Sequence, residues 1–137
     1  MSRVQVAAVA AAVAGVVVSI YLTVLHYAGS PAACPVSGPV NCELVLTSPY
    51  AIVAATSIPT SVAGILWFAL SALLWTRRVG WTQVAWSAIG MVVVLYLVFI
   101  EIVKLGAICL WCTVAHVLVL LIFLIAVTVG GRRQSAY

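Results

Sequence analysis

Four cysteines carry the chemistry that this sequence can perform. Cys109 and Cys112 form a Cys-x-x-Cys motif, whereas Cys34 and Cys42 are separated by a longer stretch that contains prolines. Two cysteines three apart on a helix share a face and can close a small disulfide ring. At a helix N-terminus the partial positive charge stabilises a thiolate, the species that attacks a disulfide or a quinone ring. The motif therefore predicts redox chemistry, although by itself it also fits a metal site or two incidental buried thiols.

The stretch between Cys34 and Cys42 predicts a bent loop, because its prolines and glycine forbid regular structure and bring the two cysteines together. Asn41 is expected to cap a short helix that begins near Cys42. Ser48 and Pro49 predict a second short helical start, with Ser48 as its cap and Pro49 in its first turn. These segments are too short to cross a bilayer and are expected to cover the mouth of a helix bundle. Taken alone, this cysteine pair fits a purely structural disulfide equally well.

His116 continues the face of the Cys-x-x-Cys motif. The offsets from Cys109 to Cys112 and His116 correspond to roughly 0°, 300° and 340° around a helix axis. The imidazole can donate a hydrogen bond to a quinone carbonyl or transfer a proton, and an ionisable residue inside a membrane is uncommon. A histidine that is satisfied by a neighbouring helix is an equally good interpretation of this residue alone.

The elements that must position these residues are four apolar segments. Hydrophobic residues make up 66% of the 137 residues and charged residues only 6%, more apolar surface than a small soluble globule can bury. Each segment is close to the roughly 20 residues that cross a bilayer as a helix. The sequence thus predicts an all-α integral membrane four-helix bundle, one domain over residues 1–137, with helices at about 4–25, 59–75, 81–100 and 107–129.

The basic residues predict the orientation of this bundle. Five of the six flank the ends of segments that would share one side, and only Lys104 falls on the other. The five are Arg3, Arg77, Arg78, Arg132 and Arg133. The positive-inside rule then places both termini in the cytoplasm. A long redox loop at about 27–58 and a short turn at about 101–106 lie outside, at the extracytoplasmic face of an inner or plasma membrane.

Three further features have simple interpretations. The net charge of +4 comes from bases scattered at segment ends, with no basic stripe, so nucleic-acid binding is not expected. The first segment follows Arg3 like a signal peptide, but it is longer than a signal core and lacks a convincing cleavage site, so a retained helix is expected. Glu101 and Lys104 are expected to pair across the short outer turn.

All four cysteines fall in or beside the two outer connections, on an oxidising face. Together the pairs predict a relay. The loop pair Cys34/Cys42 takes electrons from a soluble dithiol protein, and the pair Cys109/Cys112 passes them to a hydrophobic acceptor between the helices, each thiol step proceeding through a mixed disulfide.

The order of these motifs resembles the vitamin K epoxide reductase family, particularly its bacterial members. The resemblance covers nearly the whole chain. It consists of a Cys-x7-Cys loop, a serine six residues later, an Ile-Pro-Thr-Ser-x-x-Gly helix opening and a Cys-x-x-Cys opening the last helix. Here these are Cys34 and Cys42, Ser48, the segment from Ile58 to Gly64, and the segment from Cys109 to Cys112.

The resemblance implies a role for each cysteine. Cys112 would be the thiolate that faces the quinone, and Cys109 its partner, able to exchange with Cys42. Cys34 would meet a soluble extracytoplasmic thioredoxin-fold protein of the DsbA type. Many bacterial relatives carry such a domain fused after an extra helix. This chain ends at Tyr137, so the partner is expected to be a separate protein.

The resemblance also implies quinone contacts at Ser48, Thr60 and His116. Ser48 matches the family's serine near the reactive centre. Thr60 and His116 stand where family members place an asparagine and a tyrosine that hydrogen-bond quinone oxygens. These departures from the vertebrate pattern favour menaquinone or ubiquinone as the electron-accepting co-substrate over vitamin K epoxide, and no metal is expected.

Three other interpretations compete with this one. DsbB-type proteins also have four helices and four thiols, but they place the Cys-x-x-Cys motif first, whereas here it comes last. A small transporter for a soft metal ion would use cysteine pairs as ligands, yet such a path should include ligands deeper in the bilayer. A non-catalytic scaffold with a stapled loop leaves the Cys-x-x-Cys motif unexplained.

Overall fold

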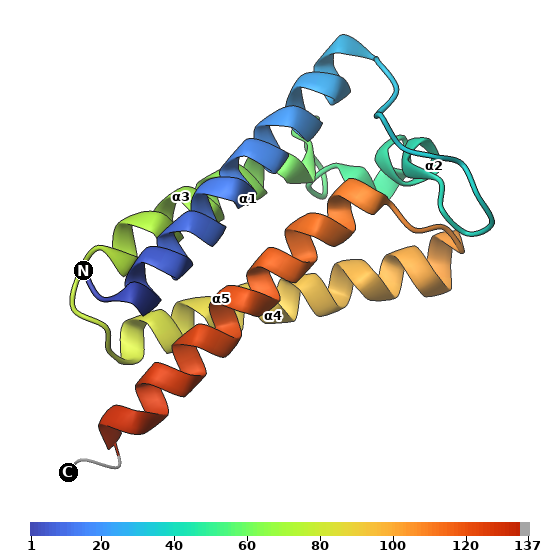
Figure 1. The fold of residues 1–137 in the computed structure, drawn as a ribbon. Coiled ribbons are helices and arrows are strands. Elements are labelled where there is room, and N and C mark those ends of the chain that lie inside the picture. Colours follow the sequence, from blue (N-terminus) through green and yellow to red (C-terminus); the bar gives the residue numbers. More distant parts are fainter. Residues whose placement is uncertain (135–137) are drawn as a thin grey trace.

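A computed structural model describes residues 1–134 of the chain, and this part is helical with no β-strand (Figure 1). The side chain of Arg133 and the terminal Tyr137, both used in the sequence analysis, lie outside the described residues. The elements are the helices α1 (Arg3–Ala28), α2 (Cys42–Leu46), α3 (Thr60–Trp75), α4 (Trp81–Phe99) and α5 (Leu110–Gln134), with a short 3-10 helix η1 (Pro49–Ala51) and a π-helical segment η2 (Ile100–Leu105).

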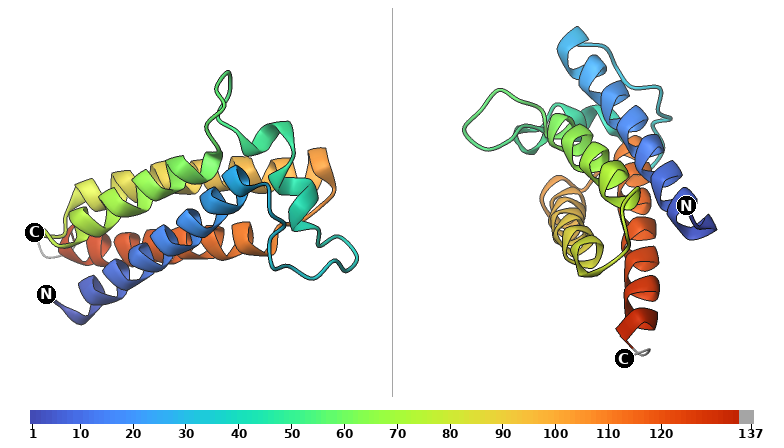
Figure 2. Two further views of the ribbon diagram at one scale, coloured as in Figure 1. Left: turned by 90° about the horizontal axis from the view of Figure 1, so that it is seen from above. Right: turned by 90° about the vertical axis from the view of Figure 1, so that its left-hand side faces the viewer.

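The long helices run lengthwise beside one another, with α1 packed on α3 and α5, and α4 packed on α5 (Figure 2). The start of α1 and the end of α5 lie at one end of the molecule, and α2 lies at the other (Figures 1 and 2). Within residues 1–134, three helices are long and apolar enough to cross a membrane: α1, α4 continued through η2, and α5. The predicted all-helical fold is therefore confirmed, with three helices that could span a membrane. Because α3 has only 16 residues, a fourth span stays a prediction.

The helices approach one another closely where small residues meet aromatic rings. Ala8, Ala12 and Gly15 lie on the buried side of α1, and a side chain at Gly15 would overlap the ring of Phe68 on α3. Gly90 on α4 leaves equivalent room for the indole of Trp67. Small residues let helix backbones come together without an apolar driving force in lipid, so packing of this kind fixes the helices that surround the site.

The third predicted helix is longer than expected, and the predicted outer turn at about 101–106 is wrong in its position. The chain continues from Phe99 through the π-helical η2 as far as Leu105, because its residues are still mostly apolar. Gly106 ends it with φ of 61°, a left-handed conformation that glycine adopts without steric cost. The connection between η2 and α5 is therefore only residues 106–109.

The long loop contains the two short helices that its sequence predicts. Asn41 caps α2, with its side chain accepting a hydrogen bond from the Leu44 N–H at 3.1 Å. Ser48 precedes η1 and Pro49 opens it. The Ser48 hydroxyl, however, does not cap η1, because it donates to the Val45 carbonyl at 2.7 Å instead. This bond joins η1 to the end of α2.

Candidate active site

The four cysteines come together at the end of the molecule that holds α2. Cys42 and Cys109 belong to one buried apolar cluster, and Cys34 and Cys112 pack against it. Cys34 and Cys42 form a disulfide with their Cα atoms 6.2 Å apart, while Cys109 and Cys112 are free thiols. The loop pair Cys34/Cys42, called the outer pair below, is thus joined by a disulfide. The pair Cys109/Cys112, called the inner pair, consists of free thiols in the same cluster of side chains.

Backbone hydrogen bonds hold the disulfide loop against the start of α5. The Ile108 N–H donates to the Pro39 carbonyl at 2.8 Å, and the Asn41 N–H donates to the Ile108 carbonyl at 3.0 Å. This register brings Cys42 to the first turn of α5, where the Leu110 N–H points at the Cys42 sulfur at 3.2 Å. Cys42 therefore lies beside Cys109, which immediately precedes the same turn.

The other flank of the disulfide is held by two aromatic side chains. The indole N–H of Trp111 donates to the Ala33 carbonyl at 2.9 Å, and the Ala33 N–H donates to the Tyr21 hydroxyl at 3.1 Å. The two rings contact each other with centroids 4.9 Å apart. Trp111 lies between the two cysteines of the Cys-x-x-Cys motif. A residue of the motif is therefore hydrogen-bonded to Ala33, the residue before Cys34.

The two cysteines of each pair differ in burial: one is fully buried, here called sealed, and the other is partly exposed, here called accessible. Cys42 is 2% exposed and Cys109 is 0% exposed, whereas Cys34 and Cys112 are only partly buried. A thiol-disulfide exchange requires the attacking sulfur to reach its target. A soluble dithiol can therefore reach the disulfide at Cys34 and not at Cys42.

Cys109 lies in the connection between η2 and α5, directly before the first residue of α5. Its sulfur accepts a hydrogen bond from the Cys112 N–H at 3.3 Å. A hydrogen bond with the Cys112 side chain lowers the pKa of the Cys109 thiol, although burial opposes this. The positive end of the helix acts in the same direction. The sealed thiol that faces Cys42 is thus disposed to react as a thiolate.

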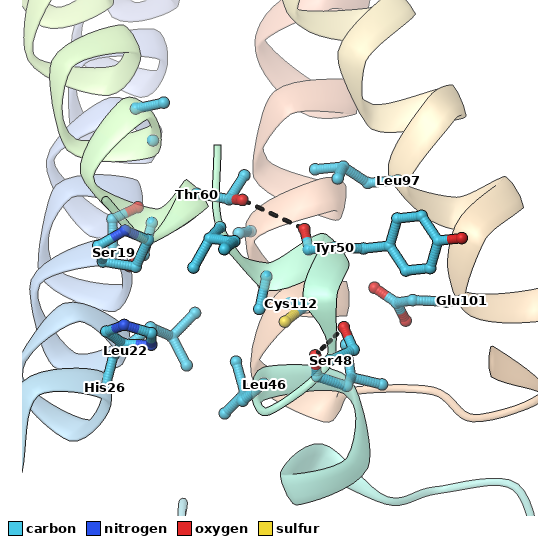
Figure 3. Close-up of a pocket in the computed structure, with 18 of the residues that line it drawn as sticks. Ser19, Leu22, His26, Leu46, Ser48, Tyr50, Thr60, Leu97, Glu101 and Cys112 are labelled. Atoms are coloured by element: carbon cyan, nitrogen blue, oxygen red, sulfur yellow. Dashed lines mark hydrogen bonds between the residues drawn. The ribbon is translucent and has the colours of Figure 1, made fainter. Parts of the chain in front are cut away.

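A cavity of about 660 Å³ opens beside Cys112 (Figure 3). All four long helices line it, α2 and η1 border it at the outer end, and most of its wall is apolar. Pockets of roughly 300–1,000 Å³ hold small organic ligands in proteins. Cys112 reaches this space and Cys109 is not among its lining residues. The cavity can therefore hold an apolar ring next to one thiol of the pair.

The three other site residues predicted from the sequence also line this cavity: Ser48, Thr60 and His116. Thr60 opens α3, and its hydroxyl donates to the Tyr50 carbonyl at 3.4 Å (Figure 3). His116 lies one turn beyond Cys112 on α5. The structure therefore brings these three residues to one space with Cys112, from three separate parts of the chain.

Sequence reasoning missed the setting of Glu101. The expected pair with Lys104 is not formed: within the described residues the Glu101 carboxylate makes no ion pair, and Lys104 is exposed. Glu101 is instead 6% exposed, and its Oε2 accepts a hydrogen bond from the Cys109 N–H at 3.1 Å. An acid within a long apolar run was the available signal, since such residues in spans are generally functional.

The comparison with protein families adds to this geometry. The model of the vitamin K epoxide reductase family matches residues 6–127, which include all four cysteines and every residue placed at the cavity above. A search among curated proteins found no significant match. Since the family match extends over most of the 137 residues, the chain belongs to the vitamin K epoxide reductase family.

Proposed function

We propose that this protein is a membrane thiol:quinone oxidoreductase that supports disulfide bond formation. One observation carries the proposal: Cys112 opens onto an apolar cavity, while Cys109 beside it is sealed against Cys42. The inner pair thus faces an apolar acceptor on one side and the outer pair on the other. Such an arrangement suits the transfer of electrons from thiols to a lipid-soluble ring.

Family membership makes the chain a membrane oxidoreductase. We extend this to a single domain over residues 1–137 whose four long helices all cross an inner or plasma membrane. Both termini are assigned to the cytoplasm on the distribution of Lys and Arg. The position of α2 at the end opposite the start of α1 and the end of α5 (Figure 1) supports an extracytoplasmic site for the cysteines.

The first step of the proposed relay is an attack on Cys34. A thiolate of a soluble thioredoxin-fold protein, of the DsbA type, forms a mixed disulfide with Cys34, and Cys42 leaves as a thiolate. The second thiol of the partner resolves the mixed disulfide, which leaves the partner oxidised and Cys34 reduced. Exposure of Cys34 and burial of Cys42 support this choice of target.

The second step joins the two pairs. With Cys109 and Cys112 oxidised, the Cys42 thiolate attacks the Cys109 sulfur and Cys112 leaves as a thiolate. Cys34 then attacks Cys42, which restores the outer disulfide and releases Cys109. The product is the arrangement that the structure contains, with Cys34 and Cys42 joined and the inner thiols free.

The third step returns the inner pair to its disulfide. Two S–H bonds break and one S–S bond forms between Cys109 and Cys112, while two electrons and two protons convert a quinone into a quinol. Ser48, Thr60 and His116 are proposed to position the quinone, because their side chains line the cavity beside Cys112. Menaquinone and ubiquinone are the proposed acceptors.

Quinone reduction by the purified protein in detergent tests this function, with a dithiol as electron donor and wild type compared with Cys112→Ala. We expect turnover in the wild type and none in the variant, since only Cys112 of the pair reaches the cavity. Circular dichroism of both proteins controls for insertion and folding.

The same assay separates the competing function. If folded wild-type protein with accessible thiols reduces neither menadione nor a short-chain ubiquinone, the oxidoreductase proposal fails and transport of a soft metal ion gains weight. Full activity in Cys112→Ala would instead show that another group faces the acceptor.

A further inference from the structure

Glu101 is a buried acid at the redox site for which the relay above has no use. It is one of only two acidic side chains in the chain. It lies in the π-helical η2 between α4 and the connection to α5. Segments of π-helix are rare and are frequent at functional sites. Burying a carboxyl group among apolar side chains is costly, so its presence here requires a physical reason.

Hydrogen bonds fix this carboxyl group beside the inner cysteine pair. Oε2 accepts from the Cys109 N–H at 3.1 Å, and the Glu101 main-chain carbonyl accepts from the Ala107 N–H at 3.1 Å. Both the side chain and the backbone of Glu101 are therefore tied to the four-residue connection that leads into Cys109. The carboxyl group cannot move away from the inner pair without losing its hydrogen bond to the Cys109 N–H.

The second carboxyl oxygen is available to a ligand or to a proton. Among the described residues Oε1 has no hydrogen-bond partner. It is not among the fully buried atoms that lack a partner, and Glu101 lines the cavity together with Cys112. Figure 3 shows the carboxyl group turned inward on the side of the Cys112 sulfur. One oxygen is thus anchored to Cys109, and the carboxyl group lies at the wall of the space where the acceptor would lie.

We propose that Glu101 carries a proton between the inner thiols and the quinone. This inference rests on the proposed oxidoreductase function. Quinone reduction needs two protons as well as two electrons, and an apolar cavity contains few groups that can move them. A carboxylate that is held beside the thiols and open to the cavity supplies such a route.

The step balances within the reaction already described. The Glu101 carboxylate takes the proton of the Cys112 thiol as the thiolate forms. The two thiols lose two electrons and close their disulfide. Glu101 then gives its proton to one oxygen of the reduced ring and returns to the carboxylate. The proton of Cys109 leaves to water at the outer face, and the second quinol oxygen takes one proton from the same water.

The closing experiment is a single turnover of the quinone step alone. Protein reduced with a dithiol and freed of it is mixed with menadione or a short-chain ubiquinone, and loss of the quinone absorbance is followed. Glu101→Gln keeps an oxygen that accepts the Cys109 N–H but cannot carry a proton. We expect the rate to fall by about 10²-fold or more, in the range of general acid–base effects. The control Lys104→Gln alters an exposed side chain of the same π-helical segment and should leave the rate unchanged.

The outcomes separate the two proposals. A wild-type rate in Glu101→Gln would show that the group only positions Cys109 and would overturn the inference while the oxidoreductase function stands. Absence of quinone reduction in the wild type would overturn both. Reduction of the Cys34–Cys42 disulfide by the dithiol should proceed at the wild-type rate in Glu101→Gln, because that half-reaction does not involve the cavity.

A second measurement covers the case in which Glu101→Gln does not fold. Time-resolved infrared difference spectra of wild-type protein after quinone addition should contain a transient carboxyl C=O band, which rises as one acid takes up the proton and decays as it releases it. With only two acidic side chains, the band can be assigned: it should persist in Glu43→Gln and shift in Glu101→Asp. A spectrum without such a change would contradict the proton-carrier role.

Discussion

The two cysteine pairs are built on the same plan but open onto different surroundings. In each pair one sulfur is sealed and the other is accessible. The sealed sulfurs, Cys42 and Cys109, share one buried cluster. The accessible sulfur of the outer pair, Cys34, lies in the loop, whereas that of the inner pair, Cys112, lines the cavity.

This difference teaches that the burial and the contacts of the four cysteines together favour one order of exchange. Every thiol of a relay is chemically able to attack every disulfide, so direction must come from which sulfurs can meet. Here the buried Cys42 and Cys109 lie beside each other and link the two pairs, whereas Cys34 and Cys112 open onto different surroundings. The following predictions break this order at one end, then at the other, and then loosen the contact between the pairs.

Cys112→Ala should have the largest effect, since it removes the sulfur at the cavity and abolishes quinone reduction. It should also leave the Cys109 thiolate free to attack Cys42, so that Cys34 departs and a Cys42–Cys109 disulfide accumulates. Peptide mapping under non-reducing conditions will identify this bridge. A Cys34–Cys109 bridge would show that the sealed sulfurs are not the ones that meet.

Cys42→Ala should break the order at the opposite end. Cys34 then lacks its resolving partner, and a mixed disulfide with an oxidised thioredoxin-fold protein should accumulate, visible by non-reducing electrophoresis. Cys34→Ala is the matched control and should give no adduct, because Cys42 is 2% exposed. An adduct formed through Cys109 would reverse the proposed direction of the relay.

Trp111→Phe should have the smallest effect of the three. The phenyl ring keeps the contact with Tyr21 but loses the hydrogen bond to the Ala33 carbonyl. A hydrogen bond contributes about 1 kcal/mol net, so exchange between the pairs should slow by roughly 5-fold. Trp81→Phe, at a side chain 71% exposed, is the control and should not change dithiol-driven quinone reduction. An unchanged rate in Trp111→Phe would show that this hydrogen bond does not contribute to exchange between the pairs.

Much of the fold follows from local signals. Apolar runs predicted helices close to the observed α1, α3 and α5, and the Asn41 cap of α2 was predicted from its residue type. The π-helical continuation through η2 was not predicted, because hydropathy does not distinguish a helix that continues from a turn between two helices. The end of η2 is marked by the positive φ of Gly106. The backbone conformation of a glycine cannot be predicted from its identity alone.

The site divides in the same way. Cysteine spacing predicted two pairs near one face, and the structure brings them into one cluster. The bonds that hold the pairs together join backbone groups distant in sequence, such as Ile108 with Pro39 and Asn41. Backbone groups are common to all residues, so side-chain identities contain no sign of this register. Glu101 was visible in the sequence, but its partner is also a backbone N–H, and proximity to Lys104 suggested a different role.

The shortness of α3 has a consequence for the lipid around the site. Its 16 residues extend about 24 Å, whereas a hydrocarbon core is about 30 Å thick. If α3 crosses the membrane as proposed, the bilayer beside it must thin or the segment before Thr60 must enter the headgroup layer. Either adjustment shortens the path from the outer aqueous phase to the cavity. Hydrophobic mismatch at a single helix thus brings water closer to a site that must exchange protons, without any polar channel through the bundle.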